Sequence, residues 1–213
     1  MKLHNQIIYN LAFFRNLKRK TLRKRAIKDL LPWAINGFPL PPPHIVKQFY
    51  LVSLAKKHKL TTFIETGTYL GDMIFALEPY FTDIFSIEID ETLYSKAKQR
   101  FKNSKNIILH HGDSGRVLQK VLAEIQDQSL IWLDGHYSGP GTGMAEMSTP
   151  IIDELNAIRD FCHNESLVVI DDLHCFNGTE GYPSSEELTN IAQESGFSIL
   201  EKRLNTISFR KAK

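Results

Sequence analysis

The chain has 213 residues, of which 42% are hydrophobic and 23% are charged, as in a globular protein that can bury a sizeable core. Its two cysteines, Cys162 and Cys175, exclude a disulfide framework and lack the Cys-x-x-Cys spacing of a thiolate metal site, so we expect free thiols in a cytoplasmic compartment. The net charge of +2 hides an asymmetry, because residues 1–28 hold nine Lys or Arg and no acid, which leaves an acidic body.

The first 28 residues predict a basic amphipathic helix. Leu3, Ile7, Leu11 and Phe14 recur at helical spacing, and basic residues follow as far as Lys28. The apolar part is too short and too interrupted to span a bilayer or to act as a signal peptide. Such a helix could dock on an anionic membrane, which would make the protein peripheral to it. The alternatives are a solvated helix that covers one side of the domain, or a subunit contact in a homo-oligomer.

A proline-rich segment separates this arm from the rest of the chain. Residues 39–43 contain four prolines, which can neither continue a helix nor join the interior of a sheet. We therefore expect two parts: a helical basic arm with its connector over 1–43, and a catalytic body over 44–213.

Within the body, helical and strand patterns alternate after a first helix over 44–58. We expect five strands, over 63–65, 84–90, 106–111, 129–134 and 166–172. Each strand is followed by a helix; these helices begin at 72 or extend over 91–101, 115–125, 150–161 and 184–195. Two short strands, over 197–201 and 206–210, close the chain. This order predicts a Rossmann-like, doubly wound α/β fold. Its seven-stranded sheet would be mostly parallel, with an antiparallel last strand and helices on both faces.

In such a sheet, ligands bind outside the carboxyl ends of the strands, near the point where the strand order reverses. Each predicted strand of the body ends in at least one carboxylate: Glu65, Glu88 with Asp90, Asp113, Asp134, and Asp171 with Asp172. After the first strand, a turn with glycines at 67 and 71 opens a helix, whose free N–H groups can bind an anion or a carboxylate.

This turn resembles a motif of class I S-adenosylmethionine-dependent methyltransferases. Glu65-x-Gly67-Thr68-Tyr69-x-Gly71 is similar to their first motif as used by catechol and caffeoyl-coenzyme A O-methyltransferases. The resemblance implies that this turn holds S-adenosylmethionine. It also implies that Glu88, followed by Ile89, binds the ribose hydroxyls, and that Asp113 and Ser114 hold the adenine.

A NAD-binding Rossmann domain is the rival interpretation, since it too ends its second strand in an acid. That domain needs three glycines in its first turn to admit a pyrophosphate, whereas Tyr69 stands between Gly67 and Gly71 here. Glu65 would also repel a pyrophosphate, while the methyl donor carries a cationic sulfonium and ammonium. The electrostatics favour the methyl donor.

A second group of carboxylates, Asp134 with Asp171 and Asp172, resembles the magnesium site of catechol-type and macrocin-like sugar O-methyltransferases. Carboxylates that converge at adjacent strand ends repel one another unless a hard divalent cation lies between them. Such an ion would bind an acceptor hydroxyl and lower its pKa. The alternative is that these aspartates only cap loops.

Two histidines are candidates for the base that removes the acceptor proton. His136 follows Asp134 by two residues, and we expect it to act beside Asp134 in catalysis, while His174 is a competing base or an added metal ligand. Residues 138–146 are rich in glycine and predict a mobile lid.

The sequence therefore predicts a methyltransferase that acts on a hydroxyl of a small molecule or sugar with help from Mg²⁺ or another divalent cation. A non-catalytic module that docks through its arm is the alternative. Nucleic-acid methylation is disfavoured, because the acidic body would repel phosphates and no base-flipping motif follows the fourth strand. The sequence does not identify the methyl acceptor.

Overall fold

A computed structural model describes residues 12–135, 149–179 and 181–212. Its strands are β1 (Thr62–Thr66), β2 (Asp83–Glu88), β3 (Ile107–His111), β4 (Ser129–Leu133), β5 (Leu167–Ile170), β6 (Phe197–Arg203) and β7 (Thr206–Lys211). Its α-helices are α2 (Ala12–Ile27), α3 (Leu30–Ile35), α4 (His44–His58), α5 (Asp72–Leu77), α6 (Glu91–Phe101), α7 (Ser114–Glu124), α8 (Ile151–Phe161) and α9 (Ser185–Glu194). Two short 3₁₀ helices are η1 (Glu78–Tyr80) and η2 (Leu173–Cys175).

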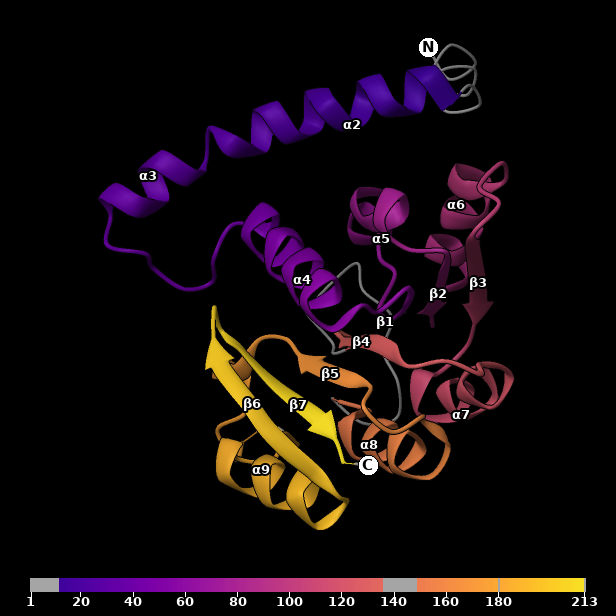
Figure 1. Cartoon of the computed structure of the whole chain (residues 1–213). Helices are drawn as coiled ribbons and strands as arrows, with labels where there is room; N and C mark the ends of the chain where they lie inside the picture. Colours follow the sequence, from indigo (N-terminus) through magenta and orange to yellow (C-terminus); the bar gives the residue numbers. More distant parts are fainter. Residues whose placement is uncertain (1–11, 136–148, 180, 213) are drawn as a thin grey trace.

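The strands form one seven-stranded sheet in the order β3-β2-β1-β4-β5-β7-β6 (Figure 1). Strands β1 to β5 are parallel, and β7 pairs antiparallel with both β5 and β6. The predicted doubly wound sheet with an antiparallel last strand is confirmed. The strand order reverses between β1 and β4, which places the expected ligand site at the carboxyl ends of these two strands.

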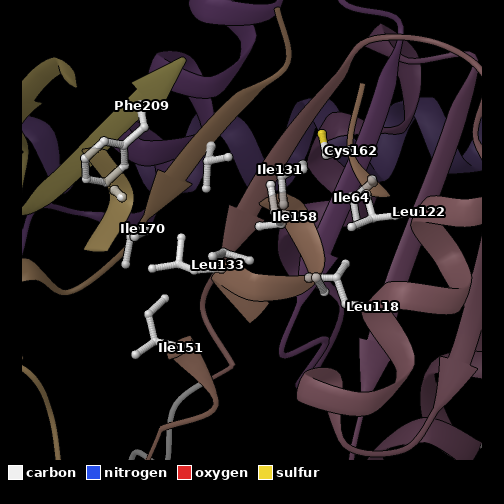
Figure 2. Close-up of a cluster of buried hydrophobic side chains, with 14 of the residues drawn as sticks. Ile64, Leu118, Leu122, Ile131, Leu133, Ile151, Ile158, Cys162, Ile170 and Phe209 are labelled. Carbon is white, nitrogen blue, oxygen red and sulfur yellow. The ribbon is translucent and has the colours of Figure 1, made fainter. Parts of the chain in front are cut away.

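The central strands are buried on both faces, and their side chains alternate between two cores. From β4, Ile131 and Leu133 join α7 and α8 in one core (Figure 2), while Leu130 and Trp132 join α4, α5 and α6 in the other. Because successive side chains of a strand point to opposite faces, Asp134 leaves the sheet on the side of α4 and α5. Residue parity thus determines which helices can reach the carboxylates at the strand ends.

Two local features were not predicted from the sequence. Helix α5 ends at Leu77 and continues as η1, because Pro79 has no N–H to extend the α-helical hydrogen bonds. Pro32, which lies in an unassigned stretch of the sequence, is part of α3. It is tolerated there because the N–H groups of a first helical turn have no partner within the helix.

The basic helix α2 lies against α5 and η1 through its arginines. Arg15 and Arg19 both form ion pairs with Glu78, and the Arg19 guanidinium lies 4.5 Å from the centre of the Phe75 ring. Arg23 donates a hydrogen bond of 2.9 Å to the Tyr80 hydroxyl. Several of the basic side chains therefore stabilise the fold, although the division of the chain at residue 43 stays a prediction.

Further basic residues are exposed on α2 and in the turn that follows it. Lys20, Lys24, Arg25 and Lys28 are exposed. In the described part of the chain, no helix combines the length and the apolar character that crossing a bilayer requires.

Candidate active site

The carboxylates predicted to form the site converge at the point where the strand order reverses. Burial raises the pKa of Glu65 at the end of β1, and the charges of Asp134 from β4 and Glu88 from β2 raise it further. All three residues leave their strands on the face covered by α4, α5 and α6. The predicted convergence along one rim is what the structure shows.

Glycine is required in the first turn by the protein's own packing. Gly67 has φ of +82°, and a Cβ there would lie 2.5 Å from the carbonyl oxygen of Asp134. At Gly71, with φ of +74°, a Cβ would lie 2.6 Å from the ring of Phe101. These two glycines bring β1 against β4 and α5 against α6, so their presence alone does not identify a ligand.

Glu65 is a buried carboxyl group beneath this turn, with 2% of its surface exposed. It accepts a hydrogen bond of 2.6 Å from the Ser86 hydroxyl, which also lies 2.6 Å from the Thr68 hydroxyl. Burial raises the pKa of Glu65 well above the usual 4.5, and the Ser86 hydrogen bond only partly opposes this shift. A cation placed beside Glu65 would favour its ionised form.

Glu88 is held by backbone N–H groups on both oxygens. Tyr69 and Asp90 donate hydrogen bonds of 2.7 and 2.9 Å to its carboxylate. Burial raises the pKa of Glu88, and these hydrogen bonds lower it. Ile89 follows, and its carbonyl oxygen accepts a hydrogen bond of 3.1 Å when His111 Nε2 carries a proton. The carboxylate is thus locked at the rim, with lone pairs left for further donors.

Asp113 and Ser114 form the start of α7 at the end of β3. Asp113 caps this helix by accepting a hydrogen bond of 3.0 Å from the N–H of Gly115. Ser114 is buried, and a Cβ on Gly135 would lie 3.2 Å from its hydroxyl oxygen. The segments that follow β3 and β4 therefore meet although the two strands are not neighbours in the sheet, and the capping role of Asp113 is compatible with a second role at the rim.

The three aspartates that follow β4 and β5 also come together. Asp134, Asp171 and Asp172 each offer one oxygen within 4.8 Å of the other two. Ligand oxygens lie about 2.0–2.1 Å from Mg²⁺, so opposite ligands are about 4.2 Å apart. The cluster is of nearly the right size, and its all-oxygen donor set suits a hard divalent ion.

Lys47 of α4 enters this cluster and was not predicted from the sequence. Its Nζ donates to Asp171 at 2.6 Å and contacts Asp172 at 3.3 Å. Burial lowers the pKa of Lys47, but the carboxylates of Asp171, Asp172 and Asp134 together raise it above its ordinary value. Lys47 therefore remains a cation inside the site.

The sequence carried one overlooked signal for Lys47. Its position shares a helical face with Tyr50, Leu51 and Leu54, which are all buried, so it is a lysine on an apolar stripe. Phe49, an apolar residue of the same helix, is instead 44% exposed and faces Arg23. Packing therefore determines which apolar face of α4 is buried, and with it the position of Lys47.

Asn205, in the turn between β6 and β7, also reaches the site without a sequence signal. Its amide nitrogen donates to Asp172 at 3.0 Å and to His174 Nδ1 at 2.8 Å, and its amide oxygen accepts a hydrogen bond of 3.0 Å from the backbone N–H of His174. The ring of His174 thus faces Asn205, and in the described part of the chain it is not one of the clustered metal-binding side chains. His136 and the predicted lid lie outside the described residues.

A cavity of about 190 Å³ lies between α2, α4 and α5. His44 and Gln48 line it from the first turns of α4, and Asp72 lines it from the start of α5. Burial lowers the pKa of His44, the charge of Lys47 lowers it further, and the charge of Asp72 opposes the shift. Because Asp72 directly follows the turn from Gly67 to Gly71, one side of the cavity lies near that turn, and helix α2 forms another wall.

Comparisons with known proteins agree with this architecture. No protein-family model matches the sequence, and the search of curated proteins gives no significant match. Among solved structures, the fold is similar to the O-methyltransferase from Bacillus cereus in complex with S-adenosylhomocysteine, with 12% identity over 87% of this chain and 90% of that chain and a TM-score of 0.58. It is also similar to the N-methyltransferase NodS from Bradyrhizobium japonicum WM9, with 14% identity over 85% and 92% of the two chains and a TM-score of 0.56.

The O-methyltransferase TomG from Streptomyces achromogenes, in complex with S-adenosylmethionine, gives 12% identity, 84% and 86% coverage and a TM-score of 0.56. The chain therefore has the fold of class I S-adenosylmethionine-dependent methyltransferases. The similar structures include both N- and O-methyltransferases, so the fold leaves the acceptor atom open.

Proposed function

We propose that the protein is an S-adenosylmethionine-dependent methyltransferase that acts on a hydroxyl group of a small molecule or sugar. The observation that carries the proposal is the convergence of Glu65, Glu88 and Asp134 at the reversal of strand order, beside the turn from Gly67 to Gly71. This position is where open α/β sheets bind ligands, and a buried acidic rim favours a cationic one.

Different residues of the rim would bind different parts of S-adenosylmethionine. Glu65, Thr68 and Tyr69 would hold its methionine end, Glu88 with Ile89 its ribose, and Asp113 with Ser114 its adenine. When bound, the donor supplies an electrophilic methyl group on a sulfonium. The protein then has to align the acceptor oxygen with that methyl, which is a matter of positioning.

For the acceptor hydroxyl, we propose metal assistance at Asp134, Asp171 and Asp172. A divalent cation bound there would lower the pKa of the hydroxyl. Asp134 would orient the acceptor, and His136 would take its proton. The oxygen cluster supports an O-methyltransferase, because its ligands suit a hard ion that prefers oxygen.

The cavity beside α2 is the proposed entry for the acceptor. Its volume of about 190 Å³ suits a small molecule. Arg19, Arg23, His44 and Gln48 contribute polar atoms to its lining, which favours an acceptor with polar groups. In this proposal the basic arm covers the acceptor.

Calorimetric titration with S-adenosylmethionine tests donor binding. We expect Glu88→Ala to weaken the affinity for S-adenosylmethionine about 10-fold or more, because it removes a buried carboxylate that would accept hydrogen bonds from the ribose hydroxyls. Asp83→Ala is the matched control, because Asp83 lies at the opposite, exposed end of the same strand. Absence of binding at millimolar donor would reject the function, and unaltered binding in Glu88→Ala would reject the ribose contact.

Chelation tests the metal. We expect EDTA to abolish methyl transfer and added Mg²⁺ to restore it. Activity that is insensitive to the chelator would leave a methyltransferase without metal assistance.

The exposed charges of α2 favour a second candidate, a module that docks on an anionic surface. Lys20, Lys24 and Arg25 are exposed on α2, and Lys28 is exposed in the turn that follows it, so exposed basic charge is concentrated at this end of the helix. Salt-sensitive binding to vesicles that contain phosphatidylserine, together with no donor binding, would favour this candidate. Vesicle binding that does not change with salt would count against it.

A further inference from the structure

We propose that Lys47 is a built-in cation of the aspartate cluster and that its ammonium competes with a divalent ion for Asp171 and Asp172. The inference rests on the proposed metal site and assigns a role to a residue outside the strand ends. It starts from the contacts of Lys47 Nζ, 2.6 Å from Asp171 Oδ2 and 3.3 Å from Asp172 Oδ1.

Lys47 already places a positive charge against both aspartates that a metal would use. Both oxygens of Asp171 are engaged, because Oδ1 accepts a hydrogen bond of 2.8 Å from the N–H of Asp172 and Oδ2 accepts from Lys47. Asp172 Oδ1 contacts the Lys47 ammonium and accepts a hydrogen bond from the uncharged Asn205 amide, which orients it. A divalent ion bound to Asp171 Oδ2 would lie beside the Lys47 ammonium and be repelled by its charge unless the ammonium moves away.

Packing holds Lys47 beside the aspartates. Only 8% of the residue is exposed, and its helical face is anchored in the core by Leu51 and Leu54, which are 0% and 3% exposed. Removing the ammonium would leave three carboxylates together in a partly buried site, where like charges repel strongly. The free protein would then become less stable and would bind a divalent cation more tightly, so the two effects are linked.

The variant Lys47→Met tests this linkage, because methionine keeps the buried stem and removes the charge. Lys47→Arg keeps the charge, and Lys57→Met is the matched control, since Lys57 is exposed on the same helix. Thermal unfolding is followed in EDTA and in millimolar Mg²⁺, and Mn²⁺ affinity is measured by calorimetry. None of these measurements involves the methyl donor, so failure of donor binding does not affect them.

We expect the wild type, Lys47→Arg and Lys57→Met to unfold at temperatures that differ little between EDTA and Mg²⁺. Lys47→Met should unfold at a lower temperature in EDTA, recover in Mg²⁺, and bind Mn²⁺ about tenfold more tightly or better. If the variant folds only with metal, its refolding yield in Mg²⁺ and in EDTA becomes the readout, and a higher yield in Mg²⁺ supports the proposal.

A metal response or refolding yield equal to that of the wild type would overturn the competition, and so would weaker Mn²⁺ binding. Mn²⁺ binding by Lys47→Met but not by the wild type would support the role of Lys47 and reject metal assistance in the natural protein.

Discussion

Adding one methyl group at Gly67 should damage both stability and the donor site. Gly67 has φ of +82°, and an alanine in this left-handed region costs roughly 1–2 kcal/mol. Its Cβ would also lie 2.5 Å from the carbonyl oxygen and 3.0 Å from the carbonyl carbon of Asp134, which are backbone atoms that cannot rotate away. Forcing the ends of β1 and β4 apart adds about 1–3 kcal/mol, as overpacking does elsewhere.

Gly196 provides the matched control, because it has the same φ of +82° and nothing lies within 4 Å of the Cβ position. We expect urea denaturation to show a loss of about 1–2 kcal/mol for Gly196→Ala and about 2–5 kcal/mol for Gly67→Ala. Calorimetry should show weakened donor binding only for Gly67→Ala. Equal losses of stability in the two variants would refute the contact with Asp134 as the reason for glycine.

Two further predictions concern buried polar groups of the site. Burial raises the pKa of Glu65 above the usual 4.5, so its contribution to stability falls as the pH rises from that value through the folded-state pKa. Glu65→Gln, which keeps an oxygen for Ser86, should stabilise the free protein more at pH 8 than at pH 5 in urea denaturation and should weaken donor binding; no gain at pH 8 would contradict this. Asn205→Ala removes the amide that orients Asp172 and should weaken Mn²⁺ binding about 10- to 100-fold in calorimetry. Asn190→Ala is the control, because Asn190 is exposed, and should leave Mn²⁺ binding unchanged. Equal Mn²⁺ affinities of Asn205→Ala and the wild type would exclude the orienting role.

The sequence predicted those parts of the fold and of the site that depend on local patterns. Continuous apolar runs such as Leu130–Leu133 and Leu167–Ile170 predict buried parallel strands, because only a sheet covered on both faces can bury both sides of a strand. A carboxylate just after each run must lie at the carboxyl edge of that sheet. The rim was therefore predictable before the order of its strands was known.

The tertiary structure decided which groups meet across long separations in the chain. Lys47 contacts Asp171 across 124 residues, and Asn205 contacts Asp172 across 33. No local pattern encodes these contacts, because they depend on which face of α4 packs on the sheet and on where the turn between β6 and β7 ends.

The glycines show the same division between sequence and tertiary structure. The sequence indicates a turn at Gly67, but only the adjacency of β1 and β4 shows that its hydrogen atom faces the carbonyl oxygen of Asp134. Local sequence thus determined the elements and the chemistry at their ends. Packing determined which of those ends are adjacent, because that choice depends on burial of the two cores as a whole.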